Sequence, residues 1–199
     1  MKTTSKTTNV LIVGVGGQGT ILSGRIISEV VLAAGLDVKV SEIHGMSQRG
    51  GSVITQVRFG EKVWSPIIPN AQADVMIAFE KLEALRSLNW MSPDGQVIVN
   101  DRELYPMPVI SGAMEYPADI KERVFAKTDK AIFLDALSMA VEAGNPKSLN
   151  LVLLGCLSMY MSFSQEAWER AIAAVVKPHF LEVNLKAFSM GREAIEKNQ

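Results

Sequence analysis

The stretch Asn9-Val-Leu-Ile-Val-Gly-Val-Gly-Gly-Gln-Gly19 decides how this sequence is expected to fold. A short apolar run that ends in glycines is typical of a strand buried in a parallel sheet. The glycines from Gly14 to Gly19 follow the spacing G-x-G-x-x-G, and a helical pattern begins directly after them. Strand, glycine turn and helix together predict the beginning of an α/β fold.

The pattern continues outward from this stretch. Apolar residues recur at helical spacing from Thr20 to Ala34, and Gly35 is expected to end that helix. Val38 and Val40 alternate with polar residues and predict a second strand, so residues 1–42 look like one β-α-β unit. Further strands are expected at Gly51 to Phe59, Asp74 to Phe79, Gln96 to Asn100 and Ile132 to Leu134, with a hairpin return at Lys62 to Trp64 and a strand start at Val109-Ile110. Helices are expected at Glu80 to Leu88, at Ala136 to Ala143 and from Leu149 onward.

These elements predict the fold class. We expect an α/β protein with a Rossmann-like, open, twisted and mostly parallel sheet, flanking helices and a helical C-terminal portion. The chain has 199 residues, which suits one domain spanning residues 1–199. The sequence contains no internal repeat and no linker-like stretch.

Composition excludes several classes of function. The formal net charge is −1, from 20 basic and 21 acidic residues, so neither nucleic acid nor a membrane surface is an expected partner. The N-terminal residues lack the apolar centre of a signal peptide, and a cytoplasmic location is expected. With Cys156 as its one cysteine, the chain lacks the thiolates of an iron–sulfur cluster. No metal site is expected, and any redox groups are expected on another chain.

The glycine turn is the first candidate site. Glycines let the backbone turn sharply, and the free N–H groups at a helix start attract phosphate. The candidate cofactor-binding residues here are Gly14, Gly16, Gly17, Gln18 and Gly19. The Gln18 amide is expected to bind a partner backbone or a ligand amide, and Glu42 lies near the position of a ribose-binding acid, about 20 residues further on. The alternative is a tight turn that binds no ligand.

A second polar, glycine-rich connection follows the second predicted strand. Its candidate binding residues are Ser47, Gln48, Arg49, Gly50 and Gly51. Ligands bind at the carboxyl ends of strands in open α/β sheets, so this connection should lie beside the glycine turn. Arg49 is expected to clamp a phosphate or carboxylate, although pairing with an acid such as Glu80 is the simpler alternative. His44 is a weak catalytic candidate because no nucleophile accompanies it, and no catalytic residue is assigned.

Both connections together resemble a known family. Gly14-Val-Gly-Gly-Gln-Gly19 followed by His44-Gly-Met-Ser-Gln-Arg-Gly-Gly51 is similar to the gamma-type domain of pyruvate/2-oxoacid:ferredoxin oxidoreductases, and most similar to its indolepyruvate branch. The resemblance extends through Asp74 to Glu80 and Gly144-Asn-Pro146 to Gly155 and Gly191, nearly the whole chain.

The resemblance implies a division of labour. Such enzymes decarboxylate a 2-oxoacid with thiamine diphosphate and magnesium, pass electrons through iron–sulfur clusters to ferredoxin, and transfer the acyl group to coenzyme A. A large alpha subunit would hold the thiamine and the clusters, and this domain alone would form the beta subunit, which binds no cofactor by itself. It would complete the active site or share in coenzyme A binding, although neither connection offers a basic cluster for the nucleotide 3′-phosphate.

Two other interpretations stay open. An independent nicotinamide- or flavin-dependent oxidoreductase would use the β-α-β unit and Glu42, but no catalytic Tyr–Lys or His–acid set accompanies them. A non-catalytic docking module would use the glycine turn only structurally. Methionines such as Met139, Met159 and Met161 would then form an adaptable contact surface, whereas we expect them to fill the core.

Overall fold

The computed structural model describes residues 7–45 and 50–197. Within these ranges a six-stranded sheet has the strand order β2-β3-β1-β4-β5-β6. The strands are β1 (Thr8–Val15), β2 (Asp37–His44), β3 (Ser52–Gly60), β4 (Ala73–Ala78), β5 (Met91–Asn100) and β6 (Ala131–Leu134). The helices are α1 (Thr20–Ala33), α2 (Lys81–Ser87), α3 (Met107–Ile110), α4 (Ile120–Phe125), α5 (Ala136–Ala143), α6 (Leu149–Ser158), α7 (Gln165–Val175) and α8 (Leu181–Glu196). Single 3-10 turns cover Leu88–Trp90, Pro146–Ser148 and Pro178–Phe180.

The sheet confirms the predicted fold class. β1, β4, β5 and β6 pair in parallel, whereas β3 runs antiparallel to both β1 and β2. The expected strands and helices around the first unit are present, and Gly35 follows the end of α1 with its N–H bonded to Leu32 O at 3.0 Å. The sheet is therefore a mixed variant of the doubly wound design, with its parallel part in the centre and on the β6 side.

The predicted β-α-β unit is only partly correct. β1, α1 and β2 follow one another as expected, but β2 does not pair with β1. β3 returns after the second connection and inserts between them, with Val15 opposite Ser52 on one side and His44 opposite Val53 on the other. Strands in a sheet are about 4.8 Å apart, so this insertion moves the end of β2 one strand further from the glycine turn than in a simple β-α-β unit.

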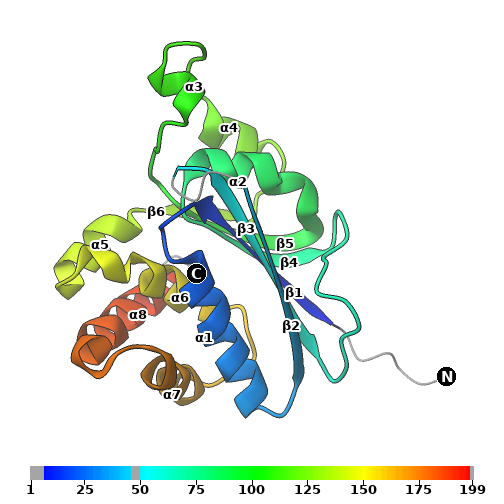
Figure 1. Ribbon diagram of the computed structural model, residues 1–199, viewed down its shortest axis with the longest axis vertical. Helices are drawn as coiled ribbons and strands as arrows, with labels where there is room; N and C mark the ends of the chain where they lie inside the picture. The colour runs from blue at the N-terminus through cyan, green and yellow to red at the C-terminus, as the bar shows by residue number, and fades with distance from the viewer. Residues whose placement is uncertain (1–6, 46–49, 198–199) are drawn as a thin grey trace.

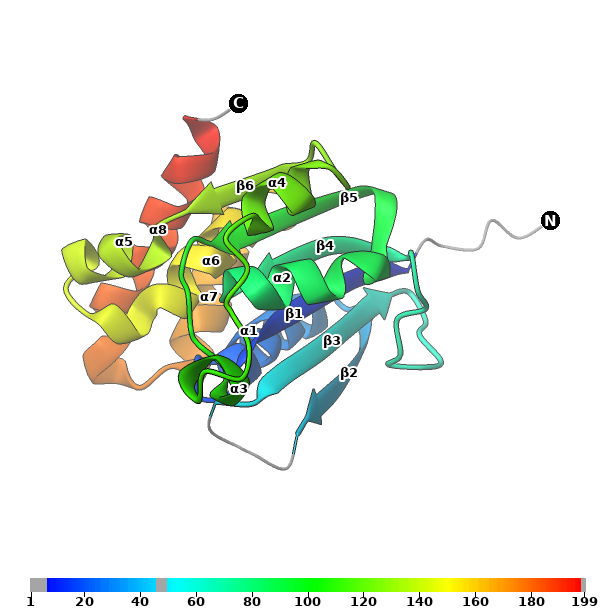
Figure 2. The ribbon, with the colours of Figure 1, turned by 90° about the horizontal axis from the view of Figure 1, so that it is seen from above.

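Alternation along the central strands produces two apolar layers. In β1, Val10 and Ile12 join the cluster under α1 and the C-terminal helices, whereas Leu11 and Val13 face α2. Figure 1 shows α1, α5, α6, α7 and α8 on one face of the sheet and α2 and α4 on the other. Figure 2 shows the same layers from above, with α2 lying over the central strands.

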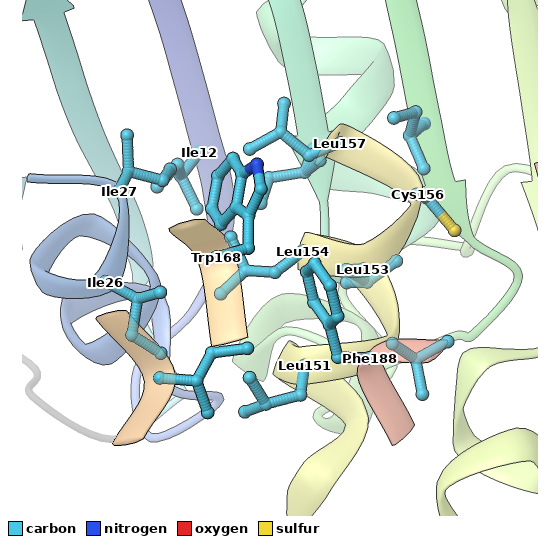
Figure 3. Close-up of a cluster of buried hydrophobic side chains, with 14 of the residues drawn as sticks. Ile12, Ile26, Ile27, Leu151, Leu153, Leu154, Cys156, Leu157, Trp168 and Phe188 are labelled. Carbon is cyan, nitrogen blue, oxygen red and sulfur yellow. The ribbon is translucent and has the colours of Figure 1, made fainter. Parts of the chain in front are cut away.

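The larger core layer lies under the C-terminal helices. Every residue of α6 is buried, which is typical of a helix that is covered on all sides. Trp168 of α7 and Phe188 of α8 are fully buried against it, with ring centroids 5.9 Å apart (Figure 3). Met139, Met159 and Met161 pack partly buried against this cluster, as expected of core-filling methionines.

Two local predictions are wrong. Residues 62–64 form no strand, because β3 takes its second partner from β2 and leaves no free edge for a hairpin return. Val109-Ile110 belongs to helix α3, whose first turn contains Pro108. Proline suits the first turn of a helix, where its missing N–H would have no intrahelical partner in any case. It does not suit a strand, because it cannot donate a hydrogen bond to the neighbouring strand. β5 begins at Met91, earlier than the expected Gln96, and its pairing register with β4 shifts in this first part.

Candidate functional site

The glycine turn presents the start of α1 to solvent. Gly17 has φ +98° and Gly19 φ +93°, a left-handed conformation that side chains rarely adopt. Gly19 is the N-cap of α1, no side chain caps the helix, and its first turn contains no acidic residue. The unpaired N–H groups and the positive end of the helix dipole are therefore available to an anion.

The Gln18 side chain, by contrast, is used within the chain. Its Oε1 accepts from Val15 N at 2.6 Å, and its Nε2 donates to Phe79 O at 3.2 Å. Asn100 Nδ2 donates to the same carbonyl at 3.1 Å, and Asn100 Oδ1 accepts from Ala136 N at 3.1 Å. These bonds tie together the ends of β1, β4 and β5 and the start of α5. The Gln18 amide is therefore engaged within the chain, and its expected contact with a partner or ligand stays a prediction.

Gly14 has a packing reason for being glycine. A Cβ at this position would lie 2.8 Å from Gln18 Oε1 and 3.0 Å from Phe79 Cβ. The residue is buried within β1, directly before the turn. Its place in the motif is explained by this close approach.

The second connection lies beside the glycine turn where the structure describes it. Gly16 N donates to Gly51 O at 2.9 Å. The two connections therefore share the carboxyl edge of β1, as the sequence predicts. Ser47, Gln48 and Arg49 fall in residues 46–49, outside the described residues, so their roles stay predictions.

A pocket of about 530 Å³ opens on the α1 side of this edge. The turn contributes Gly16, Gly17 and Gly19, and β2 contributes Glu42 and His44. Arg25 of α1 completes the wall and also lines an adjoining hollow of about 290 Å³, which Glu42 lines too. The pocket thus combines a helix start, a guanidinium, a carboxylate and an imidazole.

Arg25 was missed by the sequence reasoning, which concentrated on loops. The signal was its spacing: Arg25 lies four residues after Ile21, on the same face of α1, and Ile21 also lines the pocket. A residue little more than one turn into the helix still reaches the glycine turn because side chains lean toward the helix N-terminus.

The described candidates of the second connection, Gly50 and Gly51, line a different hollow. Gly50, Gly51 and Ser52 line a pocket of about 370 Å³ together with Glu83 and residues 104–108. Ser52 Oγ donates to Glu83 Oε2, and Arg86 Nη1 donates to Glu83 Oε1 at 2.6 Å. Of the predicted residues, Gly16, Gly17 and Gly19 thus line one hollow, and Gly50 and Gly51 line the other. His44 is exposed, and its Nδ1 lies 3.2 Å from Gly45 O, a contact that by itself assembles no catalytic pair.

A buried carboxyl group, Glu80, lies at the end of β4. Its Oε2 accepts from Glu83 N at 2.9 Å, and its Oε1 accepts from Leu104 N at 3.3 Å and from the Tyr116 hydroxyl. Burial raises the pKa of Glu80, although these hydrogen bonds oppose the shift. In the sequence, Glu80 was a possible partner for Arg49 and was not expected to be a buried carboxyl group. The signal for burial was its place directly after a buried strand, three residues before Glu83.

Residues 7–45 and 50–197 contain no group of three or more His, Cys, Asp or Glu side chains placed to hold a metal ion. In the same ranges, no helix has the length and apolar character required to cross a membrane.

Comparisons with known proteins agree with this fold. The keto/oxoacid ferredoxin oxidoreductase gamma subunit of Geobacter sulfurreducens has a TM-score of 0.72 at 23% identity, covering 96% of this chain and 99% of that one. A 2-oxoglutarate:ferredoxin oxidoreductase chain from Magnetococcus marinus, solved with 2-oxoglutarate, coenzyme A and succinyl-CoA bound, has a TM-score of 0.70 at 22% identity. There the match covers 98% of this chain and 32% of that one. These likenesses establish the class of fold.

Sequence relatives identify the family. The family model for pyruvate ferredoxin/flavodoxin oxidoreductase matches residues 9–194, and the chain belongs to this family. Indolepyruvate oxidoreductase subunit IorB of Thermococcus kodakarensis is 40% identical over 191 residues, which cover 94% of this chain and 95% of that protein. The subunit of the same name from Pyrococcus horikoshii is 41% identical over the same shares of both chains.

Proposed function

We propose that this chain is the small subunit of a thiamine-diphosphate-dependent 2-oxoacid:ferredoxin oxidoreductase that acts on indolepyruvate or a related arylpyruvate. The observation that carries the proposal is the 40% identity to an indolepyruvate oxidoreductase subunit over 94% of the chain. Such an enzyme converts the 2-oxoacid and coenzyme A into acyl-coenzyme A and CO₂ and passes the electrons to ferredoxin. The chain acts as one domain of that complex and is inactive alone.

The redox groups are assigned to the large partner subunit, together with thiamine diphosphate and magnesium. An iron–sulfur cluster takes four thiolates, and the sequence has one cysteine. Cys156 is buried between α6 and α8, its Sγ donates to Gly191 O at 3.2 Å, and burial raises the pKa of its thiol to about 12. This thiol packs as part of the core, which supports a complex in which ferredoxin draws its electrons from the partner.

The pocket beside the glycine turn is proposed to hold a phosphate-bearing part of coenzyme A. Coenzyme A supplies the thiol that accepts the acyl group. The N–H groups at the start of α1 would bind phosphate oxygens, and Arg25 would bind a phosphate bidentately. The Glu42 carboxylate would repel a phosphate group, since both are negatively charged. It would instead accept a hydrogen bond from a hydroxyl group of the ligand. The residues on the wall thus fit a ligand that carries both phosphate and hydroxyl groups.

A reconstitution experiment tests this function. The purified chain, the purified large subunit and their mixture are assayed for arylpyruvate-dependent reduction of a viologen dye with and without coenzyme A. The proposal expects coenzyme A-dependent activity in the mixture and none with this chain alone. A colourless chain that oxidises the substrate unaided would contradict it, as would a large subunit whose full activity does not require this chain.

A stand-alone nucleotide-dependent oxidoreductase is the second candidate. The observation in its favour is that Glu42 lines the same pocket as the turn glycines. Against it, β3 separates β2 from β1, so Glu42 lies one strand further away than in a simple dinucleotide-binding unit. Saturable binding of NADH by the isolated chain, measured by fluorescence and lost in Glu42→Ala, would favour this candidate over the subunit.

A further inference from the structure

A short apolar arm extends from the sheet edge. We call residues 104–116 the arm; it contains α3 and connects the end of β5 toward α4 (Figure 1). Its exposed apolar side chains are Tyr105 (55% exposed), Met107 (70%), Ile110 (64%) and Met114 (64%). A cluster of large apolar side chains left in water on a structured protrusion marks a surface that another molecule covers.

The base of the arm is held firmly by the buried carboxyl group. Glu80 Oε1 accepts from Leu104 N at the beginning of the arm and from the Tyr116 hydroxyl at its end. The rings of Tyr105 and Tyr116 pack with centroids 5.2 Å apart. Pro106 adds a fixed backbone angle directly before α3. The apolar tip is therefore preorganised, so less conformational entropy is lost when a partner binds it.

The chemistry of the arm selects among possible partners. From Leu104 to Met114 the sequence contains no charged residue, and Glu103 and Glu115 flank this run. Nucleic acid and anionic lipid both require basic residues, which the tip lacks. The buried centre of a protein–protein interface is depleted of charge and enriched in methionine and aromatic side chains, as this tip is. The matching surface is an uncharged apolar groove on another protein.

The position of the arm indicates which protein that is. The hollow that contains Gly50, Gly51 and Ser52 is lined on its other side by residues 104–108 and 110. The arm thus lies at the sheet edge where the proposed function brings the partner's active centre. In the Magnetococcus marinus enzyme, a domain of this fold accounts for 32% of a longer chain, so the neighbouring parts there belong to the same polypeptide.

We propose that the arm inserts its apolar tip into an uncharged groove of the large subunit, next to the site that the two subunits share. This inference rests on the proposed function, because the large subunit is the partner named there. The insertion would fix the orientation of the glycine-rich edge toward the partner's active centre. The other occupants to be tested are a second copy of this chain and a neutral lipid surface.

Binding of the purified large subunit to immobilised chain tests the arm. The arm variant carries Met107→Ser, Ile110→Ser and Met114→Ser. The control variant carries three changes of similar exposed residues on the opposite face of the sheet, Leu32→Ser, Val141→Ser and Phe180→Ser. Circular dichroism and thermal unfolding confirm the fold of each variant. Met107→Ser alone serves if the triple arm variant does not fold.

The proposal expects the dissociation constant to rise at least about tenfold for the arm variant and to stay within about twofold for the control. Unchanged binding by a folded arm variant, or an equal loss in both variants, would overturn it. A native chain that forms an arm-dependent dimer or binds phosphatidylcholine vesicles through the arm would assign the surface to those occupants instead. If the native chain does not bind the large subunit at all, the proposed function fails together with the arm.

Discussion

The N–H of Gly16 donates to the carbonyl oxygen of Gly51 across 2.9 Å and so joins the two glycine-rich connections of the chain. The bond extends the antiparallel register of β1 and β3, in which Val15 lies opposite Ser52. Because of it, the start of α1 and the beginning of β3 form one continuous edge. One hollow opens on each side of this edge, and the proposed ligand and partner surfaces lie in these two places.

Gln18 is predicted to stabilise the fold rather than to bind a ligand. Gln18→Leu removes the acceptor of Val15 N and one of the donors to Phe79 O. A partly buried N–H left without a partner costs about 1–3 kcal/mol, so urea unfolding should show a loss of that size. Gln165→Leu is the matched control, because Gln165 is exposed and its amide donates to the side chain of Glu169.

The outcome separates two roles for Gln18. We expect the control to stay within about 0.5 kcal/mol of the native protein. If Gln18→Leu leaves the free energy of unfolding unchanged and instead weakens coenzyme A binding, the side chain binds a ligand and its internal hydrogen bonds do not stabilise the fold.

The contact between α6 and α8 requires glycine. A Cβ at Gly191 would lie 2.0 Å from Val152 O, and one at Gly155 would lie 2.1 Å from Phe188 O. Gly191→Ala should therefore lower the free energy of unfolding by about 3 kcal/mol or more, despite the roughly 1 kcal/mol that alanine gains in a helix. Chemical denaturation measures this, with Gly45→Ala as control, since a Cβ there meets nothing within 4 Å. A stable Gly191→Ala protein would show that the helices can separate at little cost.

Glu80 should make stability depend on pH in a defined direction. Burial raises its pKa above the ordinary value of 4.5, so the folded chain holds this proton more tightly than the unfolded chain. The protonated group stabilises the fold fully below about pH 4.5, and that contribution is lost as pH rises through the raised pKa. Glu80→Gln cannot titrate, so the free energy of unfolding of the native protein minus that of the variant should fall with rising pH across this window.

Glu166→Gln provides a control of opposite sign. Backbone hydrogen bonding at Glu166 and the hydroxyl of Ser164 lower the pKa of this exposed carboxyl group. Its contribution is present above the unfolded pKa and is lost as pH falls, so the same difference should rise with pH. A Glu80 difference that rises in the same way would mean that the hydrogen bonds to the carboxylate outweigh its burial.

The local parts of this structure were predictable, and the long-range parts were not. The run from Asn9 to Gly19 and the helix after it follow from residue spacing alone. The position of Gly50 and Gly51 beside the glycine turn was predictable too, because the two connections follow neighbouring predicted strands of one sheet. The insertion of β3 between β1 and β2 did not follow, because a strand's choice of partner is set by pairing across the whole sheet.

The contacts that individual side chains make were the least predictable feature of the site. Gln18 looked like a ligand contact, yet its amide has two backbone partners within the fold. Arg25 carries no motif in the sequence, yet it lines a pocket together with Glu42 and His44 of β2. Glu80 is buried, and two of its hydrogen-bond donors, Leu104 N and the Tyr116 hydroxyl, come from the two ends of the arm. Each of these outcomes depends on segments that are distant in the sequence.

The most direct test of the central claim is the Michaelis constant for coenzyme A of the reconstituted two-subunit enzyme carrying Arg25→Ala. Loss of a charge-assisted hydrogen bond is worth about 1.5–3 kcal/mol, so KM for coenzyme A should rise about tenfold or more while KM for the 2-oxoacid is unchanged. Arg25→Lys should restore part of the effect, and Arg123→Ala on α4 should have none. An Arg25→Ala enzyme with the native KM for coenzyme A would contradict the assignment of this pocket.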